Sequence, residues 1–194
     1  MRIARSSPTH SAAAALLAML VGAATAPPAR GADALQVEVE RHGRVLQVRA
    51  TLGADSSVPA CFAVLADFDR LEEFVPGLVS SEVVSAPGEP ILLHQVGLAS
   101  AAFFRVTLDV TLAVQVHPPQ RIDFERVAGN LRQMRGGWTV AGDEHHCDVA
   151  YRADIEPAFW VPPLLGPALM RNQVERQLEG LLRELGERRG TVAP

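Results

Sequence analysis

The chain has 194 residues, 48% of them hydrophobic, a formal net charge of -4, and basic residues that are scattered along its length. A chain of this length can build one domain with a substantial core and is too short for two ordinary domains plus linkers. An acidic chain without a basic cluster is poorly suited to phosphate backbones, so nucleic acid is not expected as a partner.

The N-terminal segment has the order of a secretory signal peptide. Arg2 and Arg5 precede an uncharged, alanine-rich run over residues 12–26, and two prolines follow. This run of about 15 residues is shorter than the roughly 20 that a helix needs to cross a bilayer, so a permanent anchor is the weaker interpretation. We therefore expect residues 1–32 to be a signal peptide, cleaved between Ala24 and Asp33, that exports the protein, with a bacterial periplasm as the destination.

A β-hairpin is predicted directly after this segment. Leu35, Val37 and Val39 alternate with polar residues, and the alternation resumes over residues 46–52 after a turn at His42-Gly43. Because successive strand side chains point to opposite faces, one face of the hairpin is expected to be buried.

Two short helices are predicted next. An apolar stretch with helical spacing follows a cap at residues 55–57 and contains Cys61, Val64, Leu65 and Phe68. Asp67 and Asp69 interrupt this stretch, a second small helix is expected over residues 71–75, and Pro76-Gly77 ends it by turn chemistry.

The rest of the chain reads as strands and then one long helix. Six strands are predicted over residues 79–86, 91–98, 103–116, 122–127, 131–140 and 147–155, separated mainly by glycine, proline and asparagine turns. No alternation remains over residues 164–188, where Val174, Leu178 and Leu181 instead recur at helical spacing. The long third strand must bend or twist strongly.

This order predicts an α+β fold of helix-grip type. A curved antiparallel sheet of about seven strands would wrap around the long C-terminal helix, with the two short helices following the first strand region. The first helix must stop so that the chain can cross from one edge of the sheet to the other. The domain is expected to span residues 33–188, with 189–194 as a disordered tail. A sheet wrapped around one helix tends to leave a mostly apolar pocket between them.

Four stretches carry a resemblance to a known family: FAVLADFDRLEEFVPGLVSSEVV, LLHQVGLA, HPPQRIDFERVAGNLRQMRGGW and YRADIEPAFWVPPLLGPALMRNQVERQLEGLL. They resemble the START-related polyketide cyclase and dehydrase group of the SRPBCC superfamily, nearest to its coenzyme Q-binding branch. The resemblance covers roughly residues 35–186 and implies a hydrophobic ligand held between sheet and helix. It does not select one role, because this superfamily contains cyclases, lipid carriers, hormone receptors and chaperone partners.

Bulky apolar side chains are the first candidates for the wall or the mouth of the pocket. They are Phe103, Phe104, Met134, Trp138, Trp160, Leu165, Leu169 and Met170. The apolar stretch 159–165 joins the last strand to the helix, where it could touch a membrane surface, close the pocket or pack the start of the helix.

Three polar side chains are further candidates for ligand contacts. Arg126 and Arg132 share the apolar phase of their strands and could each hold a ligand carbonyl or carboxylate. Alternatively, both reach solvent or pair with nearby carboxylates such as Glu156. His94, near a strand centre, could donate a hydrogen bond or move a proton, or be a satisfied structural group.

Other polar clusters favour neither metal nor acid-base chemistry. In the run from His145 to Asp148, neighbouring residues point to opposite faces of a strand, and no second cluster supplies the remaining metal ligands. The carboxylates at residues 67–73 are typical of a solvated loop and helix cap. No nucleophile elbow and no phosphate-binding glycine loop is present. No catalytic residue, metal or cofactor is therefore predicted.

The two cysteines allow two interpretations. In an oxidising compartment Cys61 and Cys147 could form one disulfide. Each also falls in the apolar phase of its own segment, so two small buried hydrophobic residues would fit equally well.

The leading functional hypothesis is an exported binding or carrier protein for a hydrophobic small molecule, such as a lipid or an isoprenoid quinone. An enzyme similar to polyketide cyclases and dehydrases, with His94 or an arginine polarising a carbonyl, is one alternative. An interaction module with a collapsed pocket is the other. The expected partners are the ligand and, transiently, a membrane surface, and a monomer is favoured.

Overall fold

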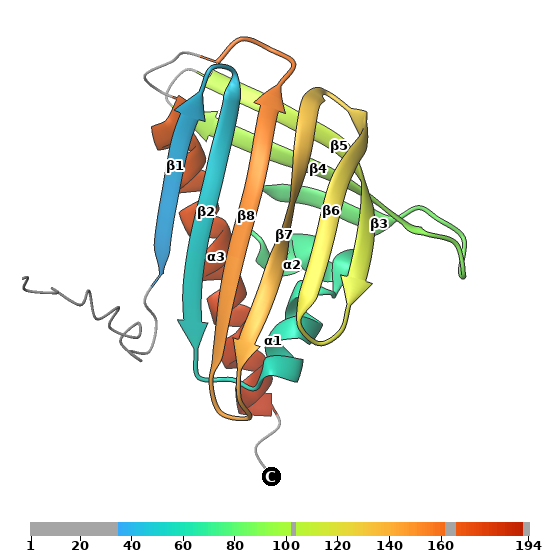
Figure 1. Cartoon of the computed structure of the whole chain (residues 1–194), viewed down its shortest axis with the longest axis vertical. Coiled ribbons are helices and arrows are strands. Elements are labelled where there is room, and N and C mark those ends of the chain that lie inside the picture. Colours follow the sequence, from blue (N-terminus) through green and yellow to red (C-terminus); the bar gives the residue numbers. More distant parts are fainter. Residues whose placement is uncertain (1–34, 102–103, 162–165, 192–194) are drawn as a thin grey trace, which may run out of the picture.

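The computed structural model describes residues 35–101, 104–161 and 166–191. In these residues an antiparallel sheet of eight strands curves around one long helix, α3 (Gly166–Thr191), as Figure 1 shows. The predicted α+β helix-grip architecture is confirmed: the hairpin and the six further strands predicted along the chain all form, so the sheet has eight strands where about seven were expected.

The strands of the sheet are β1 (Gln36–His42), β2 (Val45–Ala54), β3 (Leu78–Val83), β4 (Ile91–Ala101), β5 (Phe104–His117), β6 (Arg121–Gly129), β7 (Leu131–Gly142) and β8 (Cys147–Pro157). Their spatial order is β1-β2-β8-β7-β6-β5-β4-β3. The last strand therefore pairs with the N-terminal hairpin, and the segment between β2 and β3 carries the chain to the far edge. The chain therefore crosses from one edge of the sheet to the other after the first helix, as the interruption of that helix predicted.

The sheet bends within β5, the longest strand. Its ladder with β6 shifts register between Thr111 and Leu112, because Thr111 pairs with Ala128 and Leu112 with Arg126. Such a bulge bends a strand and increases its local twist. In Figure 1, β3, β4 and β5 accordingly run at a steep angle to β1, β2 and β8, and the open sheet curves around α3.

Three short helical segments follow β2: α1 (Val58–Leu65), the 3-10 turn η1 (Phe68–Arg70) and α2 (Leu71–Phe74). The hydroxyl of Ser57 accepts a hydrogen bond from the Ala60 amide at 3.3 Å and caps α1.

The two aspartates at the end of α1 connect it to distant parts of the chain. Asp67 Oδ2 accepts a hydrogen bond from Arg188 Nη2 of α3 at 2.6 Å. Asp69 Oδ1 accepts one from the Val83 amide of β3 at 2.7 Å. The interruption after α1 thus holds both the long helix and the edge strand. The role of these carboxylates is structural, but the helix cap expected for them is not formed: Asp67 precedes η1 without a side-chain cap hydrogen bond, and Asp69 bonds β3.

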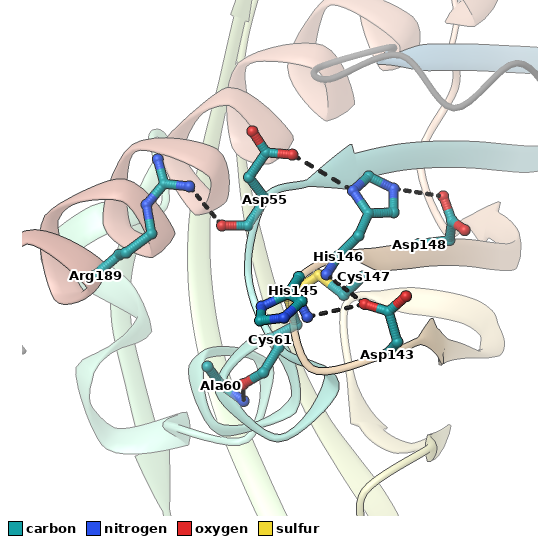
Figure 2. Close-up of a disulfide and its surroundings, with 10 residues drawn as sticks. Asp55, Ala60, Cys61, Asp143, His145, His146, Cys147, Asp148 and Arg189 are labelled. Carbon is teal, nitrogen blue, oxygen red and sulfur yellow. Dashed lines mark hydrogen bonds and ion pairs between the residues drawn. A yellow bond between two sulfur atoms is a disulfide. The ribbon is translucent and has the colours of Figure 1, made fainter.

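A disulfide joins α1 to the start of β8. Cys61 and Cys147 are bonded with their Cα atoms 6.7 Å apart, and both side chains are fully buried. Figure 2 shows the bridge beside His146, whose ring nitrogens lie 3.6 Å from Asp55 Oδ1 and 3.4 Å from Asp148 Oδ1. Of the two interpretations of the cysteines, the structure contains the disulfide.

Helix α3 buries one stripe of side chains, Val174, Leu178, Leu181 and Leu185, as its periodicity predicted. It packs on β1, β2, α1 and α2. The helix continues to Thr191, so residues 189–191 extend it into the segment that was expected to be a tail. In the part of the chain that the structure describes, no helix is both long and apolar enough to cross a membrane.

Candidate ligand-binding cavity

A cavity of about 300 Å³ lies between the sheet and α3. Because α3 packs most closely on β1 and β2, the inner faces of the more distant strands β4 to β8 are left to form one wall. The first half of α3 forms the opposite wall, and residues of α1, η1, α2 and β3 contribute to the lining. A volume of this size is at the lower end of the range for small-molecule sites, about 300–1,000 Å³.

The apolar character of the sheet wall follows from the alternation in β5. Val106, Leu108, Val110, Leu112 and Val114 all border the cavity, and the last three are buried. The residues between them point to the outer face, as a period of two requires. The strand with the strongest alternation in the sequence therefore supplies the most continuous part of the wall.

Three aromatic side chains form a distinct part of the same wall. Phe124, Trp138 and Tyr151 come from the adjacent strands β6, β7 and β8, and Trp138 pairs directly with Tyr151 across the β7–β8 ladder. The Trp138 and Tyr151 ring centroids are 4.4 Å apart, and those of Phe124 and Tyr151 are 6.1 Å apart. Offset and tilted ring pairs at these separations are favourable beyond the area they bury.

Few polar side chains border the cavity, and three of them, Gln95, Gln173 and Arg176, are already hydrogen-bonded to the protein. Gln95 Nε2 donates to Ser81 Oγ at 3.1 Å. Gln173 Nε2 donates to the Pro76 carbonyl oxygen at 3.0 Å, and Gln173 Oε1 accepts from Arg176 Nη2 at 2.5 Å. The Gln95 bond lies within the sheet, between β4 and β3, and the bond from Gln173 to Pro76 joins α3 to the turn before β3. Both glutamines therefore have reduced capacity for a ligand.

Tyr151 is different. Within the described residues its hydroxyl has no hydrogen-bond partner, although the ring borders the cavity and keeps part of its surface accessible there. Burial raises the pKa of this phenol, because a phenolate would lose its hydration among apolar neighbours. The group is therefore a neutral hydrogen-bond donor facing an apolar space.

The structure places the predicted apolar residues in three ways. Met134, Trp138, Leu169 and Met170 line the cavity. Trp160 does not; its side chain is 70% exposed, while its neighbours Phe159 and Val161 reach the lining. Phe103 and Leu165 lie outside the described residues, and only the backbone of Phe104, at the start of β5, is described.

None of the three predicted polar contacts borders the cavity. Arg132 is exposed, because the ladder to β8 shifts register between Leu131 and Gln133 and turns this side chain outward, toward Glu156 at 4.0 Å. Its predicted inward orientation is wrong, and the alternative of pairing with a carboxylate is confirmed. Arg126 is half-buried and its Nη2 donates to the Gly129 carbonyl at 3.0 Å.

His94 lies on the outer face of the sheet. Its neighbours in β4, Leu93 and Gln95, both reach the cavity, so the His94 ring points the other way. The ring Nε2 lies 3.2 Å from Asp109 Oδ1 on β5. This arrangement fits the structural role better than proton transfer to a bound ligand.

No group of three metal-ligating side chains comes together in residues 35–101, 104–161 and 166–191. Cys147 is part of the disulfide and has no thiolate to offer.

Sequence reasoning missed Phe124 and Tyr151, the two partners of Trp138. The sequence contained a signal for both. Phe124 lies two positions after the buried Ile122, and Tyr151 lies two positions after the buried Val149, so each shares the inward phase of its strand. What the sequence lacked was the strand order that brings β6, β7 and β8 side by side.

The comparisons with known proteins agree with this architecture. Residues 56–182 match the family described as Polyketide cyclase / dehydrase and lipid transport. No curated protein matches the chain in sequence.

Three solved structures illustrate the similarity. A START superfamily protein from Mycobacterium smegmatis has a TM-score of 0.63 at 14% identity, covering 73% of this chain and 97% of that one. A STAR-related lipid transfer protein from Xanthomonas axonopodis has a TM-score of 0.63 at 16% identity, covering 81% and 96%. The Zhui aromatase/cyclase from a Streptomyces species has a TM-score of 0.58 at 16% identity, covering 74% and 95%.

At these identities the likeness to solved structures shows a shared fold, whereas the family match rests on the sequence itself and extends over more than half of the chain. The protein therefore belongs to the polyketide cyclase/dehydrase and lipid transport family.

Proposed function

We propose that the protein binds a hydrophobic small molecule in the cavity between the sheet and α3 and carries it without changing it chemically. The observation that carries this proposal is the cavity of about 300 Å³, with its apolar walls and few polar side chains. Such a space is about ten times the volume of one water in the liquid, so a ligand of about a dozen non-hydrogen atoms fits inside it. A longer chain would extend through an opening.

The distribution of titratable groups supports binding over catalysis. The side chains that were candidates for polarising a substrate carbonyl, His94, Arg126 and Arg132, do not border the cavity. A general acid or base must lie within hydrogen-bond reach of the atom it serves. The enzyme hypothesis would have to rely on Tyr151 and the glutamines, whereas a carrier needs only the apolar walls.

The family match and one structural neighbour support the kind of ligand. The family description includes lipid transport, and a STAR-related lipid transfer protein shares the fold. We propose a lipid or an isoprenoid quinone as the ligand class. We also propose that Trp160, which is exposed beside the cavity-lining residues Phe159 and Val161, contacts a membrane surface during transfer.

We propose further that the protein works outside the cytoplasm, in a periplasm. The order of charges, apolar run and prolines in residues 1–32 supports export. The disulfide between Cys61 and Cys147 supports the same compartment, because structural disulfides persist in oxidising environments. Fractionation of cells that express the full chain tests this: recovery of a shortened, disulfide-bonded form in the periplasm is expected, and a full-length reduced form in the cytoplasm contradicts it.

Extraction and mass spectrometry of the molecule that co-purifies with the protein tests the carrier function. The variant Trp138→Arg places a charge in the aromatic wall, and Thr139→Arg is its matched control, because the neighbouring residue Thr139 is exposed and does not border the cavity. One lipid or quinone at near-stoichiometric amount is expected in the wild type and the control and not in Trp138→Arg. Equal amounts in all three, or an empty wild type that takes up no lipid from vesicles, would refute the proposal.

A further inference from the structure

The polar groups that border the cavity differ in what they can still offer. Gln95 and Gln173 donate to Ser81 and to the Pro76 carbonyl. In the described part of the chain, three uncharged side chains of the lining carry a polar group for which no hydrogen bond is formed: the Tyr151 hydroxyl, the Gln177 amide and the Trp138 indole N–H. Gln177 lies on the α3 wall, and Tyr151 lies on the sheet wall opposite it.

The surroundings of Tyr151 are apolar and aromatic. The tilted Trp138 ring and the stacked Phe124 ring both lie against it, and Ala50 pairs with it on β2. Burial raises the pKa of its phenol, so the hydroxyl keeps its proton at neutral pH. A donor in such a place is left without a partner unless a water or a ligand supplies an acceptor.

The described lining residues contain almost no formal charge. Among the described lining residues Arg176 is the one that carries a formal charge, and its side chain is exposed on α3, where it donates to Gln173. No cation therefore lines the aromatic wall. A carboxylate or phosphate placed against Tyr151 would lose its hydration without gaining a counter-charge, which is costly.

We propose that Tyr151 selects the ligand: the cavity takes uncharged molecules that present a carbonyl or another hydrogen-bond acceptor to the Tyr151 hydroxyl, beside the Trp138 and Phe124 rings. This rests on the proposed binding function and names the polarity of its ligand. The acceptor end enters the aromatic part of the cavity, and the hydrocarbon remainder lies along the aliphatic wall of β5. Anionic amphiphiles such as ionised fatty acids are rejected at this position.

Three probes of equal carbon number separate this selection from simple hydrophobic binding: methyl nonyl ketone, undecane and undecanoate. The Trp160→Phe variant serves as the parent protein, because it leaves Trp138 as the single tryptophan and hence as a fluorescence reporter in the cavity wall. Tyr151→Phe in the same background removes the hydroxyl and keeps the ring.

We expect the parent to bind the ketone more tightly than undecane and undecanoate. Tyr151→Phe should weaken ketone binding roughly three- to tenfold, the value of one neutral hydrogen bond, and change undecane binding by less than about twofold. Equal affinity of the parent for ketone and alkane, or a loss in Tyr151→Phe that is the same for both, overturns the selection while leaving hydrophobic binding intact. Failure of all three probes to bind the parent overturns the proposed function itself.

A second measurement uses the protein without any change at Tyr151. The infrared carbonyl stretching band of bound methyl nonyl ketone should lie at lower wavenumber than in a dry alkane solvent, because a hydrogen-bonded carbonyl is weakened. A bound ketone whose carbonyl band is the same as in the alkane accepts no hydrogen bond, and that result contradicts the proposal even if Tyr151→Phe fails to fold.

Discussion

Reduction of the disulfide between Cys61 and Cys147 is expected to remove a large share of the stability of the protein. The bridge joins residues separated by 86 positions, so it closes a loop over nearly half of the chain. The loop-closure relation for a cross-linked unfolded chain gives about 4–5 kcal/mol for a loop of this size. Because single domains are stable by about 5–15 kcal/mol, the reduced protein should be only marginally folded.

Because the disulfide is buried, the change in stability on reduction should report the effect of the cross-link alone. Both sulfur atoms are buried, and reduction leaves two thiols in the same places, so no cavity is created. The Cys61→Ala/Cys147→Ala variant adds the loss of two buried side chains and should be less stable than the reduced wild type. It should not respond to reductant at all, which makes it the control.

Equilibrium unfolding in urea, with and without reductant, measures the difference. The urea concentration at the unfolding midpoint should be well above that of the reduced protein when the disulfide is intact. The free energy of unfolding of each form follows from its midpoint and its slope m, which scales with the surface exposed on unfolding. A difference in the free energy of unfolding of less than about 1 kcal/mol between the oxidised and reduced protein would refute the reasoning. It would mean that the disulfide restricts the unfolded chain far less than a loop of this length predicts.

Three further predictions concern α3 and Tyr151. Gly180→Ala should destabilise the protein, because a Cβ there meets the carbonyl oxygen of Phe74, the last residue of α2. Gly186→Ala has nothing within 4 Å of its Cβ and should stabilise the protein by about 0.5–1 kcal/mol through helix propensity. Thermal unfolding measures both variants, and equal shifts of their melting temperatures would contradict this prediction. A double-mutant cycle on Asp67→Asn and Arg188→Gln, measured by urea unfolding, should give a coupling of roughly 1–2 kcal/mol for this partly buried, hydrogen-bonded pair, and a coupling near zero would show that the contact is not formed. Burial raises the pKa of Tyr151 above its unfolded value of about 10. Its contribution to the free energy of unfolding is therefore complete below about pH 10 and is lost as the pH rises toward the folded pKa. The stability of the wild type should fall above about pH 10, and that of Tyr151→Phe should fall less steeply. The absorbance of tyrosinate reports this group alone, since the chain has one tyrosine, and a phenol that titrates at its ordinary pKa in the folded protein would show the prediction to be wrong.

Local periodicity was sufficient to predict the elements and their class. Alternation over residues 103–116 and helical spacing from Val174 to Leu185 reflect the face that each element buries, and that face is set by the backbone geometry of the element itself. Boundaries differed by a few residues, mostly because strands and α3 extend past their last apolar residue. The number and order of such elements then leave few ways to pack them.

The same local argument failed for Arg132 because an irregularity in pairing is not visible in one strand. The shift between Leu131 and Gln133 reverses the phase of the side chain, and it depends on the partner strand β8. Met134 and Trp138 lie beyond the shift and keep their predicted phase toward the cavity.

Contacts between distant residues were decided by the tertiary structure alone. The sequence contains both cysteines and the inward phase of Tyr151, yet it does not say that Cys61 meets Cys147 or that the Tyr151 ring packs against Trp138 and Phe124. Those contacts require β8 to pair with β2 on one side and β7 on the other, which joins segments about a hundred residues apart. Periodicity specifies which face of an element is buried, whereas the partner of that face follows from strand order, a property of the whole sheet.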